Sequence, residues 1–309
     1  MLADIGGTNA RFARSDPDGG IGARRAYKVA EFTDFESALQ AYLDDTSDFE
    51  PCTAAAVGAA GPVLDGDVRL TNAPWRISEA GLSRLLGGMP VCLVNDTEAV
   101  ALALPRLRHD ELKSIGEVGE APSRARRMLA LNVGTGFNAA TVIPVHGRWF
   151  TCPSEAGHMS FAAQGEAERA LLGGGDTAAV TVEDALSGDG LMRIYRAACR
   201  SLGSEPAAAD SQKVFAGAGI DAAATETLRL FTIWLGQVAR DLALATAAWG
   251  GVYLTGGVVH GWCAVASASL FRASFESSDK MRERLLATPT AAIIRDDAAL
   301  VGLAHAPLD

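Results

Sequence analysis

The sequence predicts an α/β fold with two lobes, each built from a mixed β-sheet with flanking helices. Segments typical of strands alternate with segments typical of helices along the whole chain. A strand, a glycine-rich turn and a returning strand occur near the start, at residues 2–13, and again at residues 128–143. Because such hairpins add antiparallel strands to parallel ones, we expect both sheets to be mixed.

The first glycine-rich turn consists of Gly6, Gly7, Thr8 and Asn9, between two short apolar runs. Glycines let backbone N–H groups approach an anion, and the Thr and Asn side chains add further donors. Asp4, at the end of the preceding strand, suits a hydrated metal ion. The turn therefore fits a phosphate group, although the same residues would also make a hairpin that binds nothing.

The second turn is a partial copy of the first. Gly134, Thr135 and Gly136 follow the apolar run 128–131. A third glycine turn, Gly256-Gly257, ends the apolar run 252–254. Three such turns at strand ends indicate two related lobes that hold one nucleotide from both sides.

Apolar spacing predicts the remaining elements of the first half in chain order. We expect an outer strand at 21–29, a helix at 34–43, a helix from Ser78 to about residue 87, a buried strand at 91–94, and a helix from Thr97 that stops near Pro105. Residues 109–127 are charged and lack periodicity, which predicts a surface segment at the boundary between the lobes.

In the second half the helical pattern returns. We expect helices at 164–172, 182–200 and 225–248, a last strand at 288–294, and a small-residue helix at 296–304. The expected lobes are residues 1–105 with 296–309, and residues 106–295.

Composition limits the classes of partner. The chain has 309 residues, 49% of them hydrophobic, and a net charge of −10 without a large basic cluster, so we expect no nucleic-acid partner. The five cysteines are odd in number and form no Cys-x-x-Cys pair, which favours reduced thiols in a cytoplasmic protein. Residues 242–271 are uncharged, but glycines divide them into short pieces, so we expect no membrane span.

Asp96 is the candidate catalytic base. A carboxylate directly after a buried strand lies where α/β folds open their ligand crevices. Phosphoryl transfer needs a group that accepts the proton of an attacking hydroxyl. The alternative is that Asp96 only caps the helix that follows.

A second polar group suits a sugar. Glu155 and His158 lie three residues apart, and Glu183 and the Asn95 amide add carboxylate and amide groups that can pair with adjacent hydroxyls. Alternatively, the histidine is a structural hydrogen-bond partner and Glu183 lies on a solvated helical turn. Metal ligation by His158 and Glu155 is less favoured, because no second histidine is near.

Together these motifs resemble the bacterial ATP-dependent glucokinases over nearly the whole chain. The matching segments are Asp4 to Arg11, Thr71-Asn72 with Trp75, Val94 to Asp96, Gly134 to Gly136, Ser154 to His158, Glu183 to Gly188, Gly256 to Val258 and Asp297 to Gly302. The resemblance is to the type without the zinc-binding cysteine motif. It implies membership of the hexokinase and actin-like ATPase superfamily, whose duplicated ribonuclease H-like lobes hold nucleotide and sugar in the cleft between them.

The resemblance also implies roles for the candidate residues. Asp96 would take the proton from the 6-hydroxyl of a hexose, with Asn72, Asn95, Glu155, His158 and Glu183 on the sugar. The first and second turns would contact the phosphates of ATP, Gly256-Gly257 would lie by the adenosine, and Asp4 would sit near Mg²⁺, through water. D-glucose is the expected hexose, and a homodimer is compatible with the family.

Four departures from the family pattern bear on affinity and substrate. Asn132 and Asn138 replace glycines beside the second turn, Thr97 replaces a phenylalanine after Asp96, and Ala73-Pro74 alters the segment before Trp75. A kinase for another hexose or an amino sugar therefore stays open. So does a sugar- or nucleotide-binding sensor with weak turnover, although the presence of Asp96 and Asp4 favours an enzyme.

Overall fold

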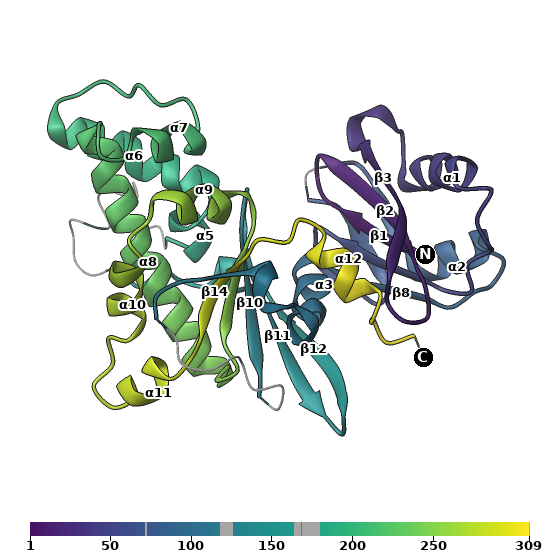
Figure 1. Cartoon of the computed structure of the whole chain (residues 1–309). Helices are drawn as coiled ribbons and strands as arrows, with labels where there is room; N and C mark the ends of the chain where they lie inside the picture. Colours follow the sequence, from purple (N-terminus) through teal and green to yellow (C-terminus); the bar gives the residue numbers. More distant parts are fainter. Residues whose placement is uncertain (72, 118–125, 164–167, 169–179, 309) are drawn as a thin grey trace. The chain divides into compact units, whose positions relative to one another are not determined.

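The computed structural model describes residues 1–71, 73–117, 126–163, 168 and 180–308 (Figure 1). Contacts divide the chain into two compact units: Met1–Leu107, Trp149–Pro153 and Asp296–Asp309 form the first, and Arg108–Arg148 and Ser154–Arg295 form the second. The sequence-based division at 105/106 and 295/296 did not assign residues 149–153 to the first unit. They belong to β12 (Arg148–Ser154), whose sequence carries no sign of a boundary.

The sheet of the first unit is mixed, as predicted. It contains β1 (Leu2–Ile5), β2 (Asn9–Ser15), β3 (Ile21–Lys28), β4 (Ala55–Ala59) and β8 (Val91–Asn95), in the order β3-β2-β1-β4-β8. The β1, β4 and β8 strands are parallel, and the hairpin adds β2 and β3 antiparallel to them. The carboxyl ends of the three parallel strands therefore lie at one edge of the sheet.

One face of this sheet is covered by α1 (Phe35–Asp45) and α2 (Glu79–Leu85). The predicted apolar face of α1 is fully buried: Phe35, Ala38, Leu39 and Tyr42. The ring of Tyr42 stacks on Phe12 of β2, with 5.1 Å between the centroids. A small sheet completes this side, formed by β5 (Val63–Leu64), β6 (Asp67–Arg69) and β7 (Arg76–Ser78).

The opposite face is covered by α3 (Asp96–Ala103) and α12 (Ala298–Leu303). Gly58 of β4 lies under both helices, because a Cβ there would be 3.0 Å from the Cβ of Ala99 and 3.6 Å from Leu303. Gly302 of α12 meets the backbone of Ala99 directly. The small residues predicted for the last helix thus allow it to pack closely on α3.

The second unit also has a mixed sheet. Its strands are β9 (Leu112–Ser114), β10 (Met128–Val133), β11 (Phe137–Val145), β13 (Val252–Thr255) and β14 (Thr290–Ile293), in the order β11-β10-β13-β14-β9. β10, β13 and β14 are parallel, and β11 is antiparallel to β10. Together with the first sheet, this confirms the predicted fold class.

Helices surround this second sheet. They are α5 (Val182–Ala185), α6 (Gly188–Leu202), α7 (Ser211–Gly217), α8 (Ala222–Thr246), α9 (Gly257–Val265), α10 (Ala268–Phe275) and α11 (Arg282–Leu286). The long helix α8 is plain in Figure 1 and buries its predicted apolar residues in the core: Leu228, Phe231, Leu235, Val238 and Leu242. Short 3-10 turns occur at Val29–Glu31, Leu104–Arg106, His109–Glu111 and Ala156–His158.

Several predicted elements are corrected by the structure. The helix expected at 182–200 is two helices, because Ser187 starts α6 by accepting a hydrogen bond from the Gly190 N–H. The segment 109–127 contains the edge strand β9, which is too short to show periodicity. The helix expected at 164–172 lies outside the described residues, apart from residue 168.

No helix in the described part of the chain is long and apolar enough to cross a membrane. All five cysteines are free thiols.

The contact between α12 and α3 predicts that a side chain at Gly302 lowers the stability of the protein. A Cβ at this position would overlap the carbonyl oxygen of Ala99, so Gly302→Ala should lower the free energy of unfolding by about 1–3 kcal/mol. Gly22→Ala in the same unit is the control, because a Cβ there meets no atom within 4 Å. Urea unfolding of both variants measures the difference, and equal stability of the two would show that α12 can move away from α3.

Candidate functional site

The strand β8 carries Asn95 and Asp96 to the carboxyl edge of the first sheet. The side chain of Asn95 caps α3: its Oδ1 accepts a hydrogen bond from the Thr97 N–H at 2.9 Å. Glu98 completes a capping box, because its Oε2 accepts a hydrogen bond from the Asn95 N–H at 3.2 Å. Asp96 is therefore the first residue of the helix and not its cap, so the helix begins one residue earlier than predicted.

The Asp96 carboxylate is mostly buried at this edge. Burial raises its pKa to about 6, and the nearby negative charge of Asp4 also raises it. Hydrogen bonds from Thr97 act in the opposite direction: the N–H and the hydroxyl both donate to Oδ1, at 2.7 Å and 3.2 Å. A carboxylate with such a pKa is a suitable proton acceptor near neutral pH.

Asp4 lies in β1 and faces Arg11 across the hairpin. The two residues are direct partners in the strand register, and Nη1 of Arg11 lies 3.2 Å from Oδ2 of Asp4. Burial raises the pKa of Asp4, while the Arg11 guanidinium lowers it. The first unit thus holds two carboxylates close enough to interact, with one guanidinium on the Asp4 side.

Asp4 and Asp96 suit Mg²⁺ only if water and substrate phosphates supply its other ligands. No group of three or more His, Cys, Asp or Glu side chains that could hold a metal occurs among the residues the structure describes. Mg²⁺ commonly keeps several waters and binds through one or two carboxylates together with substrate phosphates. The Asp4 carboxylate, which lies close enough to Asp96 to interact with it, suits that arrangement, and the assignment of Asp4 to Mg²⁺ stays a prediction.

The first glycine turn is closed and tied to β3. The Gly6 N–H donates to the Asn9 carbonyl at 3.0 Å, and the Val29 N–H donates to the Thr8 carbonyl at 3.0 Å. Lys28 donates from Nζ to Oδ1 of Asn9 at 2.8 Å. Lys28 could not be identified from the sequence, because a lysine on an outer strand carries no signal until its register opposite Asn9 is known.

The second glycine turn lies between the beginnings of two helices. The Gly134 N–H donates to the Gly136 carbonyl at 2.9 Å, and the Gly188 N–H at the start of α6 donates to the Gly134 carbonyl at 2.8 Å. A Cβ on Gly134 would lie 4.0 Å from the Gly257 nitrogen, where α9 begins. Because helix N-termini favour anions, this arrangement fits a phosphate group.

The third turn adopts a backbone that requires glycine. Gly256 has φ of 104°, and a Cβ there would overlap the carbonyl oxygen of Val133. Gly257 differs, because a Cβ there meets no atom within 4 Å. The side chain of Asn132, one of the departures from the family pattern, lies beside Gly256: its Oδ1 would be 2.7 Å from a Cβ at that residue.

Glu183 braces the second turn. Its Oε2 accepts a hydrogen bond from the Phe137 N–H at 2.8 Å and would lie 2.5 Å from a Cβ on Gly136. The same oxygen would be 3.4 Å from a Cβ on Gly157. Glu183 thus joins the turn to the segment that carries Glu155 and His158, and it is more than a residue on a solvated helical turn.

The other predicted sugar ligands differ in their exposure and in their hydrogen bonds. Glu155 and His158 are exposed, at the two ends of the short turn Ala156–His158. Asn95 is buried, and besides capping α3 it donates from Nδ2 to the Gly61 carbonyl at 2.9 Å. The Asn95 side chain also hydrogen-bonds to the Asp96 carboxylate, which lowers the pKa of Asp96. Asn72 lies outside the described residues.

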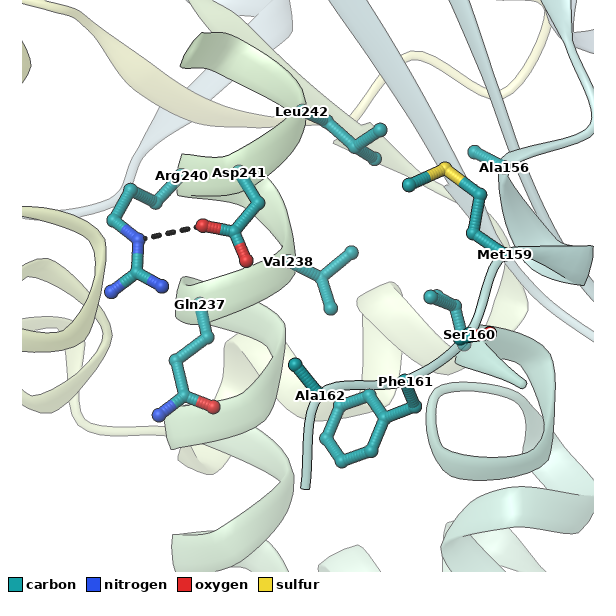
Figure 2. Close-up of a pocket in the computed structure, with 11 residues that line it drawn as sticks. Ala156, Met159, Ser160, Phe161, Ala162, Gln237, Val238, Arg240, Asp241 and Leu242 are labelled. Atoms are coloured by element: carbon teal, nitrogen blue, oxygen red, sulfur yellow. Dashed lines mark hydrogen bonds and ion pairs between the residues drawn. The ribbon is translucent and has the colours of Figure 1, made fainter. Parts of the chain in front are cut away.

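A small pocket of ≈ 70 Å³ lies between α8 and residues 156–162 in the second unit (Figure 2). Its wall is largely apolar, and an ion pair of 2.9 Å between Arg240 and Asp241 lies at one side. None of the predicted site residues lines it. Pockets that enclose drug-sized ligands measure about 300–1,000 Å³, so this one is too small for a nucleotide.

Comparisons with known proteins agree over the length of the chain. The model of the family described as Glucokinase matches residues 1–308. The glucokinase of Rhizobium meliloti (strain 1021) is 34% identical, over 98% of this chain and 90% of the relative. That of Chromobacterium violaceum is 36% identical, over 98% of this chain and 88% of the relative.

Solved structures show the same similarity. A glucokinase from an Antarctic psychrotroph has a TM-score of 0.85 and 29% identity, covering 98% of this chain and 97% of that one. A Balamuthia mandrillaris glucokinase in complex with glucose has a TM-score of 0.79 and 21% identity, covering 98% and 91%. At that identity, the second similarity concerns the fold alone.

The raised pKa of Asp96 predicts that the site costs stability. The pKa of Asp96 is about 6 in the folded protein, against an ordinary value of 3.8. Ionisation of Asp96 therefore has no effect on stability below pH 3.8, lowers stability progressively between pH 3.8 and pH 6, and has its full effect above pH 6. The full difference corresponds to about 3 kcal/mol, and partial solvent exposure reduces it, so Asp96→Asn should stabilise the first unit by about 1–2 kcal/mol at pH 8. The gain should shrink at pH 5.

Urea unfolding at the two pH values measures this effect. Asp34→Asn in the same unit is the control, because hydrogen bonds from Ser37 lower the pKa of the exposed Asp34 carboxyl. No gain is expected there. An Asp96→Asn variant that is less stable than the wild type at pH 8 would contradict a buried charge at Asp96.

Proposed function

The chain belongs to the glucokinase family, and we propose that it transfers the γ-phosphoryl group of ATP to the 6-hydroxyl group of D-glucose, with Asp96 as the general base. The observation that carries this assignment is the Asp96 carboxylate at the carboxyl ends of the parallel strands of the first sheet, with a pKa raised by burial to about 6. The protein is accordingly an ATP-dependent sugar kinase.

Asp96 supplies the proton acceptor for the attack. Phosphoryl transfer leaves little covalent work to the protein, which positions the reactants and neutralises charge. Oδ1 of Asp96 is held by Thr97, so the carboxylate has a fixed orientation toward the 6-hydroxyl. Removal of that proton as the oxygen meets the γ-phosphorus makes the hydroxyl a better nucleophile.

Candidate sugar ligands occur in each unit. Glu155 and His158 of the second unit are exposed and can pair with adjacent hydroxyls, and Asn95 of the first unit lies directly before Asp96. Glu183 keeps one carboxylate oxygen beside the second turn for a hydroxyl while the other holds Phe137. Asn72 is assigned to the sugar from the sequence resemblance only.

The phosphates would be bound by the turn Gly6-Gly7-Thr8-Asn9 and by the turn Gly134-Thr135-Gly136. Backbone N–H groups and the starts of α6 and α9 supply the positive ends of dipoles, which suits an acidic chain that lacks a basic surface. Gly256-Gly257 would lie by the adenosine. Mg²⁺ near Asp4, when bound, would neutralise phosphate charge.

A coupled assay of ADP release tests the activity directly. Glucose, mannose, fructose and glucosamine are compared as substrates, and glucose should give the highest kcat/KM. Asp96→Asn should lower kcat by about 10²–10⁴-fold, because the amide keeps the shape of the side chain but cannot accept the proton. Near-normal kcat in that variant would remove Asp96 from the reaction.

The same assay separates the alternatives. Preference for mannose or an amino sugar would change the substrate and keep the mechanism. Glucose binding measured by calorimetry without ADP release from the wild type would identify a sensor.

The two glycines of the third turn test the adenosine assignment. A Cβ at Gly257 meets no atom of the protein within 4 Å, so Gly257→Leu should cost little stability and raise the KM for ATP by about 10-fold, equivalent to about 1.4 kcal/mol. Gly256→Ala is the matched variant, and it should lower both stability and ATP affinity because of its backbone and the overlap with Val133. A normal KM for ATP in Gly257→Leu would place the nucleotide elsewhere.

A further inference from the structure

Thr97 is a buried hydroxyl residue whose neighbour is the proposed base. Its relative exposure is 0%, so its hydroxyl cannot be hydrogen-bonded to bulk water. Buried hydroxyl groups almost always have a protein partner. The partner in this structure is Oδ1 of Asp96, at 3.2 Å.

Among the described threonines in and beside helices, Thr97 shares this choice of a carboxylate partner with Thr181, the N-cap of α5, whose hydroxyl donates to Oδ2 of Asp184 at 2.8 Å. At helix ends and in helix interiors, the hydroxyl donates to the carbonyl four residues earlier at six positions: Thr46, Thr225, Thr227, Thr232, Thr246 and Thr288. For Thr97, the residue four positions earlier is Leu93, whose carbonyl belongs to the buried strand β8. The position of Thr97 in the first turn of α3 therefore leaves its hydroxyl available for the carboxylate.

Two donors of one residue act on the same carboxylate oxygen. The Thr97 N–H and hydroxyl both reach Oδ1, and the N–H is shared with Oδ1 of Asn95, the helix cap. Hydrogen bonds to an ionised group are stronger than those between neutral groups. Together they restrict rotation of the carboxylate about its terminal torsion, which is otherwise broad.

From this geometry we infer that Thr97 is a positioning residue for the reaction: it fixes Oδ1 of Asp96 and thereby presents Oδ2 to the 6-hydroxyl of the sugar. The inference rests on the proposed role of Asp96 as general base. It gives a role to the Thr97 side chain, one of the positions at which the sequence departs from the pattern of its family. Thr97 touches neither sugar nor nucleotide in this role, because it acts only through Asp96.

The test removes the hydroxyl and keeps the shape. Thr97→Val is nearly isosteric and keeps the branched Cβ, and it should lower kcat by about 10- to 100-fold, the effect of one hydrogen bond to a charged group. The KM values for glucose and ATP should stay within about twofold, because binding groups are unchanged. Thr97→Ser restores the hydroxyl and should recover most of kcat, although it loses the methyl group.

The Asp96→Asn variant is used as a second background, to test whether Thr97 affects kcat through Asp96. In Asp96→Asn, the further change Thr97→Val should leave the residual rate unchanged within about twofold, because no proton acceptor remains to be positioned. Thermal unfolding of each variant is recorded alongside, and Thr97→Ala replaces Thr97→Val if the latter does not fold. Calorimetric glucose binding to Thr97→Val should match that of the wild type.

The outcomes separate this inference from the proposed function. A kcat within twofold of the wild type in Thr97→Val, or no recovery in Thr97→Ser, overturns the role of Thr97. So does a rise in both KM values in parallel with a loss of thermal stability, which is the signature of a structural role. A normal kcat in Asp96→Asn would instead overturn the proposed base, and with it the premise of the inference.

Discussion

The placement of two carboxylates at one buried edge is the constraint on which the first unit depends. Asp4 is the residue before the last of β1, and Asp96 follows β8, with β4 between these strands. Desolvation raises the pKa of both groups, so each is held in a less favourable environment than water provides. The parallel register, the Asn95 cap and the Arg11 pair hold the two carboxylates in place. In the proposed function, the stability lost by burying these charges gives a proton acceptor with a pKa near 6.

In the proposed function, the second unit would bind phosphate through backbone groups. The turn Gly134-Thr135-Gly136 lies between the starts of α6 and α9, so backbone dipoles supply the favourable field. The carboxylate of Glu183 holds the Phe137 N–H and fixes the shape of the turn. The glycines are required because side chains on Gly136 and Gly256 would overlap or crowd their neighbours. A net negative chain can bind phosphates in this way without attracting polyanions to its surface.

Much of the fold could be predicted from the sequence, because its signals are local. The apolar runs gave β8 and β10, and the spacing of Phe35, Ala38, Leu39 and Tyr42 gave α1. Elements that depend on distant partners could not be predicted. The strand β9 has three residues and exists because it pairs with β14, far along the chain.

The candidate site shows the same difference between features with a local signal and features that depend on distant residues. Residue type and position at strand ends indicated Asp96, Asp4 and the glycine turns. Strand register and side-chain packing were needed to find Lys28 beside Asn9, the bracing role of Glu183 and the bond from Thr97 to Asp96. The identity of the cap could not be decided from the sequence either, because adjacent Asn and Asp residues are equally good caps.

The packing of α12 on α3 also has a consequence for the order of synthesis. The helix that begins at Asp96 is synthesised well before its partner, residues 298–303, because the whole second unit lies between them in the sequence. Until then Gly58 and Ala99 have no helix over them from the carboxyl end of the chain. The first unit therefore cannot reach its final packing until the second unit has been synthesised, and the surroundings of Asp96 are complete only then. A chain that stopped before residue 298 would leave α3 without this cover.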